Sequence, residues 1–279
     1  MAQRFRESGR LGTQPLGDLV TIIEQLAGTD VAVLDAGPDE HGLTMRDPER
    51  GTVFIGVARS RRPMRQRSTL AHELGHVFFE DWADDGAGSR AERAPTESRA
   101  DAFARHLLVP VAGLRDFLGP PGATVQFHLS AVVQRFLVSP AIAAIALREA
   151  GYIGEATKVE WMSLSTPRLA ARYGWSDQYQ ALQADSDQRR APQRLLARAI
   201  RGYAEGVLSA QAIARLRGVP LSVVEADLRD AGITPSEPDI AWAEHTDVPE
   251  ADVDLAALDR DLAGLDDDAD GTAIRRDAP

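Results

Sequence analysis

Two histidines and a glutamate in the segment TLAHELGHVFF carry the clearest chemical signal in the sequence. His72 and His76 are four residues apart, so on a helix both rings lie on one face and can reach the same ion. Glu73 projects beside that ion without having to bind it. In this HExxH arrangement zinc lowers the pKa of bound water, and the glutamate is the general base. The segment therefore predicts a hydrolytic zinc site.

A second segment, ESRAD, offers a third ligand. Twenty residues separate His76 from Glu97, enough for a loop and the return of an antiparallel helix. Glu97 can complete a His2Glu site and leave the fourth position to water, as a catalytic zinc site requires. Asp101, one turn later, is placed to accept the outer N–H of a ligand histidine. The alternative is that both carboxylates belong to a solvated helix face and pair with neighbouring arginines.

No other residue pattern competes for this chemistry. The chain contains no cysteine, so a disulfide framework, a thiolate nucleophile and cysteine-ligated zinc are excluded. His106 lies nine residues beyond Glu97, about 180° around a helix, so we expect it to face away from the metal. The remaining histidines have structural interpretations: His128 is exposed or caps a helix, and His41 and His245 lie in a turn and in the tail.

The elements that must position these groups indicate an α+β fold. Apolar residues recur with helical spacing over residues 16–26, and three β-like runs begin at residues 31, 41 and 51. Turn residues bound each run, which predicts a small antiparallel sheet. We expect the polar residues 1–14 to be frayed. Two long helices should follow, over residues 63–79 and about 96–108.

The C-terminal half contains a weak internal repeat. Each copy has a short helical stretch, a tight turn containing proline, a second helix and a terminal glycine, at Gly151 and at Gly232. This order is that of a helix-turn-helix unit. From residue 235 onward, acidic residues, prolines and small residues cannot bury enough apolar surface to fold, so we expect a disordered tail.

The charge is concentrated in that tail. The whole chain has 31 Lys and Arg against 42 Asp and Glu, a formal net charge of −11. Residues 235–279 hold 14 of the acids and 3 of the bases, so the excess negative charge lies entirely there. The longest purely apolar run, residues 141–147, is too short to span a bilayer, and the first residues do not form a signal peptide. We therefore expect a cytoplasmic protein without a membrane segment.

A basic stretch precedes the tail. Residues 188–217 contain seven arginines and one acid, and they lead into the second copy of the repeat. Such a stretch can contact DNA through the phosphates. The alternatives are an arginine-rich solvated helix or a surface that binds an acidic segment.

Three ordered motifs resemble the ImmA/IrrE zinc-peptidase family: RQRSTLAHELGH, ESRADAFARHLLVP and VSPAIAAIALREAGYI. The resemblance covers roughly residues 15–160. It implies a zincin-like minimal metalloprotease domain with His72, His76 and Glu97 as metal ligands and Glu73 as the general base. The chain departs from the family's ExEAN pattern in having Arg99 for the second acid, and an aspartate, residue 101, for the asparagine.

The resemblance also implies a regulatory role. Members cleave a partner repressor, often one with a DNA-binding helix-turn-helix, and so relieve transcriptional repression. The expected organisation is a peptidase domain over residues 1–160, a helical domain with a helix-turn-helix-like unit over 161–234, and an acidic tail over 235–279. There is no room for an N-terminal helix-turn-helix, so we expect the repressor to be a separate protein. The alternative function is a transcriptional regulator or partner-binding module whose metal site is structural or vestigial.

Overall fold

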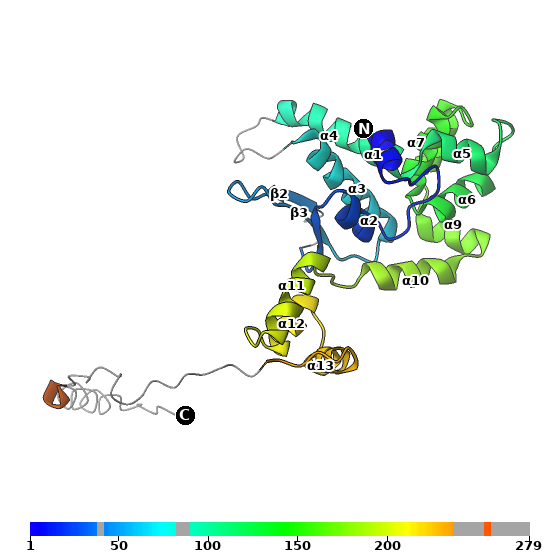
Figure 1. Ribbon diagram of the computed structural model, residues 1–279. Coiled ribbons are helices and arrows are strands. Elements are labelled where there is room, and N and C mark those ends of the chain that lie inside the picture. Colours follow the sequence, from blue (N-terminus) through cyan, green and yellow to red (C-terminus); the bar gives the residue numbers. More distant parts are fainter. Residues whose placement is uncertain (38–41, 82–89, 237–253, 258–279) are drawn as a thin grey trace, which may run out of the picture. The chain divides into compact units, whose positions relative to one another are not determined.

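The computed structural model describes residues 1–37, 42–81, 90–236 and 254–257, with the side chains of 90–94 left aside (Figure 1). Residues 1–236 form one compact unit, which contains all the elements below. The strands are β1 (Asp30–Leu34), β2 (Gly42–Arg46) and β3 (Val53–Ala58). The helices are α1 (Ala2–Ser8), α2 (Leu19–Leu26), α3 (Pro63–Phe79), α4 (Arg90–Leu108), α5 (Val111–Leu118), α6 (Gln126–Phe136), α7 (Pro140–Glu149), α8 (Glu155–Met162), α9 (Thr166–Tyr173), α10 (Ser176–Ser186), α11 (Gln193–Ala204), α12 (Ala210–Arg217) and α13 (Leu221–Asp230).

The α+β class is confirmed, but the prediction of an antiparallel sheet is wrong. The strand order is β1-β3-β2; β2 and β3 are antiparallel, whereas β1 runs parallel to β3. The turn between β2 and β3 is local, because Asp47 accepts backbone N–H bonds from Glu49 and Arg50. β1 instead pairs with the edge of β3 opposite β2. Turn residues in the sequence do not predict which edge of β3 a strand distant in the sequence will pair with. The result is a mixed sheet in which β2 and β1 are the outer strands.

Helix α3 has the bounds that the sequence predicts, and it lies between the sheet and α4 (Figure 1). Pro63 occupies the first turn, where its missing N–H costs nothing, and the helix ends at Glu80 in the left-handed conformation, with φ of 56°. Gly75 sets the approach to α4, since a Cβ on it would lie 3.1 Å from the Cα of Ala100. A larger residue there would hold the two helices apart.

Helix α4 begins earlier than predicted, at Arg90 instead of about Thr96. Pro95 lies inside it, where the lack of a backbone N–H removes one helical hydrogen bond. The proline lies near the N-terminus of the helix, where the helix accommodates it.

The expectation that residues 1–14 are frayed is wrong. Helix α1 packs on α4, and Phe5, with 3% of its surface exposed, contacts the ring of Phe78 edge-on. The buried Arg6 donates to the carbonyl oxygens of Leu107, Gly12 and Gln14. Three residues of α1 are buried, Ala2, Phe5 and Arg6, but only Phe5 is a large apolar residue, so the sequence shows no hydrophobic stripe that would predict this helix.

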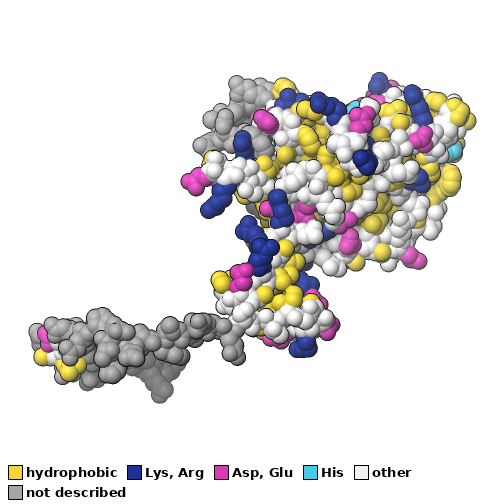
Figure 2. All heavy atoms as spheres, viewed as in Figure 1, with side chains coloured by type: hydrophobic (Ala, Val, Ile, Leu, Met, Phe, Trp, Pro, Cys, Tyr) yellow, Lys and Arg dark blue, Asp and Glu magenta, His cyan; other side chains and the backbone are white. Residues whose placement is uncertain are grey.

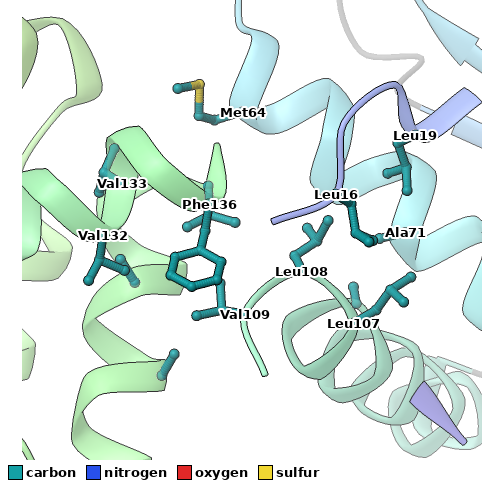
Figure 3. Close-up of a cluster of buried hydrophobic side chains, with 14 of the residues drawn as sticks. Leu16, Leu19, Met64, Ala71, Leu107, Leu108, Val109, Val132, Val133 and Phe136 are labelled. Carbon is teal, nitrogen blue, oxygen red and sulfur yellow. The ribbon is translucent and has the colours of Figure 1, made fainter. Parts of the chain in front are cut away.

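A single large hydrophobic cluster supports these helices. Figure 3 shows part of it, where Leu16 and Leu19 from the N-terminal segment meet Ala71 of α3, Leu107 and Leu108 of α4, and Phe136 of α6. The same cluster continues past residue 160, through Trp161 and Trp175 to Tyr179. Helices α8, α9 and α10 therefore pack with the predicted peptidase domain.

Helices α11, α12 and α13 enclose a second, smaller cluster around Ile213, Val224 and Leu228. Both copies of the repeat form two helices joined by a tight turn, with a left-handed Leu137 between α6 and α7 and a left-handed Gly218 between α12 and α13. In the described part of the chain, no single helix has the length and hydropathy to cross a membrane. The pair α6 and α7 meets those criteria only together, with a bend of 110° between them.

Candidate metal centre

The structure brings His72, His76 and Glu97 into one cluster. The Nε2 atoms of the two histidines are 3.0 Å apart. The Oε2 atom of Glu97 lies 3.1 Å from Nε2 of His72, and its Oε1 atom lies 3.7 Å from Nε2 of His76. Helix α3 supplies both rings and α4 supplies the carboxylate, so the close helix contact at Gly75 brings the three groups together.

These distances fit a zinc ion. A tetrahedral site with bonds of about 2.0–2.2 Å separates its ligand atoms by about 3.3–3.6 Å. The separations of 3.0, 3.1 and 3.7 Å lie around that value, the last two measured to different oxygens of Glu97. Both rings are mostly buried, whereas 53% of the Glu97 side chain is exposed. The cluster thus has a dry side formed by α3 and an open side on which a fourth position can meet solvent.

The ring of His72 is oriented by Asp101. Oδ1 of Asp101 lies 2.8 Å from Nδ1 of His72, which assigns the ring proton to Nδ1 and leaves the Nε2 lone pair directed at the cluster. A carboxylate on the outer nitrogen is the usual environment of a metal-bound histidine. The sequence predicts that Asp101 contacts a ligand histidine, and in the structure it lies within hydrogen-bonding distance of His72.

Glu73 follows His72 on α3, and its side chain lies against β2, with 9% of the residue's surface exposed. The hydroxyl of Thr44 donates to its Oε2 atom over 2.7 Å. Gly42 of the same strand passes so close that a Cβ there would be 2.7 Å from Oε1. The sequence analysis missed both strand residues, and the signal available was their two-residue spacing on one face of a strand.

His76 also faces a carboxylate that the sequence analysis did not identify. Oδ2 of Asp81 lies 3.5 Å from Nδ1 of His76. Asp81 follows directly on the left-handed Glu80 that ends α3, and it forms an ion pair with Arg99 of α4. An acid just after a ligand-bearing helix is too common for a sequence pattern to single out.

The two other described histidines lie outside the cluster. His106 lines a cavity of about 820 Å³ beside α1 and α5, together with Arg6 and Pro110. Nδ1 of His128 accepts the backbone N–H of Val125 at the start of α6, which is a capping contact. His41 and His245 fall outside the described residues.

Most arginines of the basic stretch 188–217 already have acidic partners. Figure 2 shows basic side chains gathered beside α11. Four of the seven arginines form ion pairs: Arg189 with Asp35, Arg190 with Asp18, Arg194 with Asp30, and Arg217 with Asp227. Within this stretch, Arg198, Arg201 and Arg215 have no ion pair to another described residue.

Three of those pairs hold the start of α11 and the residues just before it: Arg194 pairs with Asp30 of β1, Arg189 with Asp35 just after β1, and Arg190 with Asp18 at the start of α2. Arg190 also exchanges two backbone hydrogen bonds with Val33, so it covers the outer edge of β1. The edge of a strand is a reactive surface that proteins usually cover. The basic stretch therefore contributes to the fold by covering the edge of β1.

Comparison with known proteins identifies the region that holds the cluster. The sequence model of a peptidase family, Peptidase_M78, described as the IrrE N-terminal-like domain, matches residues 25–148. The radiation response metalloprotease IrrE of Deinococcus radiodurans is 30% identical over 145 residues, which cover 48% of this chain and 41% of that protein. The chain thus spans about two fifths of the length of the curated relative it matches. The residues from His72 to Asp101 all lie inside the matched family region.

Proposed function

Because residues 25–148 form an IrrE N-terminal-like domain of the M78 metallopeptidase family, we propose that this chain is a zinc-dependent endopeptidase that cleaves a regulatory protein. Its substrate is a helix-turn-helix repressor, and cleavage relieves transcriptional repression. The observation that carries the proposal is the convergence of His72, His76 and Glu97 within 4.8 Å of one another, with Glu73 held beside them.

In this proposal each group has one task. His72, His76 and Glu97 would hold zinc, which supplies a Lewis acid and lowers the pKa of a water molecule. Glu73 accepts a proton from water at its carboxylate and later passes that proton to the nitrogen of the departing amine. Thr44 keeps the carboxylate in place during both transfers, and Asp101 holds the ring of His72.

The decisive experiment is co-expression with a helix-turn-helix repressor, the proposed substrate. We expect a truncated repressor with the wild-type chain and an intact repressor with Glu73→Gln. The Gln variant should retain zinc, because Glu73 is not one of the three clustered residues, whereas His72→Ala should lose both zinc and cleavage. A wild-type chain purified without zinc, or cleavage that survives in the Gln variant, would contradict the proposal.

The alternative function makes the opposite prediction. A transcriptional regulator with a structural metal site would keep its biological activity in Glu73→Gln and lose it on replacement of basic residues in α11 and α12. The fixed position of Glu73 against β2 favours the peptidase, since a structural site formed by His72, His76 and Glu97 does not need a second, non-ligating glutamate held next to His72.

A further inference from the structure

Two buried polar atoms beside the metal cluster face each other without any other partner. Nδ1 of His76 and Oδ2 of Asp81 are both inaccessible to solvent, and neither has a hydrogen-bond partner among the described residues. They lie 3.5 Å apart. A buried polar atom without a partner costs free energy comparable to a lost hydrogen bond, so this pair requires an explanation.

The backbone brings Asp81 beneath the ring of His76. After the left-handed Glu80, the N–H of Asp81 returns to donate to the carbonyl oxygen of His76 over 3.0 Å. This turn places the aspartate next to the residue whose outer ring nitrogen it faces. A shift of a few tenths of an ångström would bring the two atoms within hydrogen-bonding distance.

Arg99 fixes the aspartate from the other helix. Its guanidinium donates to Oδ1, the oxygen that does not face the histidine. The same guanidinium lies over the ring of Phe79, 4.4 Å from its centroid. Held at one oxygen by α4, the Asp81 carboxylate keeps its second oxygen directed at His76.

We propose that Asp81, held by Arg99, is a positioning residue for His76. It accepts the Nδ1–H of the ring, which leaves the Nε2 lone pair directed at the cluster. Asp101 stands in the same relation to His72, so each ligand histidine is oriented by its own carboxylate. This inference rests on the proposed metal site, and it adds the residues that preorganise it.

A purely structural role for the pair of Asp81 and Arg99 predicts a different outcome. If it only joined α3 to α4, its loss would lower the stability of the metal-free chain and leave the intrinsic zinc affinity unchanged. A positioning role predicts a loss of zinc affinity and a change in the hydrogen bond of one ring. Zinc affinity and a spectroscopic signal from the His76 ring therefore distinguish the structural role from the positioning role.

The experiment is a zinc titration of the full chain, stripped of metal, against a chelator of known affinity. Asp81→Leu, which removes the acceptor at similar size, should weaken zinc binding by about 10–100-fold. Asp81→Asn, whose amide oxygen can still accept, should recover part of that loss. Arg99→Gln should weaken binding by less than Asp81→Leu, whereas Arg105→Gln, the same change on the same helix at the ion pair with Glu149, should not weaken it.

A second readout follows the ring itself. In the zinc-loaded wild type, ring nitrogen NMR should show a hydrogen-bonded proton on Nδ1 of His76, and this signal should be lost in Asp81→Leu. Wild-type affinity and an unchanged His76 signal in that variant would overturn the inference while leaving the proposed function intact. A wild-type chain that binds no zinc would overturn both. Should the Leu variant not fold, Arg99→Gln with wild-type zinc affinity and an unchanged ring signal would equally overturn the inference.

Discussion

The hydroxyl of Thr44 donates to Oε2 of Glu73 across the gap between an outer strand and the helix that carries both histidines. The bond links the proposed proton acceptor to strand β2, which limits the rotamers that the long Glu73 side chain can adopt. Gly42, on the same strand face, closes the space on the other oxygen. The catalytic carboxylate of this proposal therefore depends on a strand that contains none of the clustered ligands.

Replacement of Thr44 should impair the chemical step more than binding. Thr44→Val removes the donor at nearly constant volume, and a hydrogen bond to a charged group is worth about 1.5–3 kcal/mol, so we expect kcat to fall by about tenfold or more. Thr44→Ser keeps the hydroxyl and should retain most of the rate. The measurement is cleavage of the repressor, with KM and zinc content determined in parallel. Equal rates for the valine and serine variants would show that the bond has no role in positioning.

Gly75 should control the metal site through the helix contact. A Cβ at this position would lie 3.1 Å from the Cα of Ala100, and backbone cannot yield as a side-chain tip can. We expect Gly75→Ala to destabilise the chain by about 1–3 kcal/mol and to weaken zinc binding, because α3 and α4 are forced apart. Urea unfolding and zinc titration measure the two effects. Gly17→Ala, where no atom lies within 4 Å of the added Cβ, is the matched control and should leave both unchanged.

Features of the fold that depend on interactions between residues close in the sequence can be predicted from it, whereas those that depend on tertiary contacts cannot. The approximate bounds of helix α3 can be predicted because Pro63 and the spacing of its residues are local signals. The parallel pairing of β1 cannot, because it depends on which side of β3 the chain joins. Likewise the ligand spacing predicts the cluster, whereas Thr44 reaches Glu73 only through tertiary structure. Asp81 reaches His76 through a local left-handed turn at Glu80, a residue type that does not signal such a turn.

Asp18 should make stability depend on pH. It caps α2 by accepting the N–H groups of Val20 and Thr21, and it pairs with Arg190 at 2.7 Å. Burial raises the pKa of Asp18, but hydrogen bonds from Thr21 and Arg190 outweigh that effect and hold the pKa below its ordinary value of 3.8. A carboxylate with a lowered pKa stabilises the fold fully above its unfolded pKa, and this contribution is lost as pH falls through the folded pKa.

The corresponding variant is Asp18→Ala. We expect it to lose about 1 kcal/mol of unfolding free energy at pH 7, chiefly from the lost cap, since the ion pair is half exposed. The difference from wild type should shrink as the pH is lowered below 3.8, as measured by urea unfolding at several pH values. Arg190→Gln, which keeps the cap and removes only the charge, should cost less. A difference that stays constant from pH 7 down through the acid range would contradict the assignment.

DNA contact through residues 188–217 remains a proposal, and the ion pairs of this stretch limit its strength. Each neutralised phosphate contributes about −0.9 to the slope of log affinity against log salt concentration. Only Arg198, Arg201 and Arg215 have no acid partner among the described residues, so for the full chain we expect a slope no steeper than about −3. Arg198→Gln should reduce the slope by about 0.9, whereas Arg194→Gln, whose side chain is paired with Asp30, should leave it unchanged. If both substitutions reduced the slope equally, the paired arginines would have to leave their acidic partners and bind phosphates on DNA. A slope near zero would show that residues 188–217 do not bind DNA and serve only to hold α11 on β1.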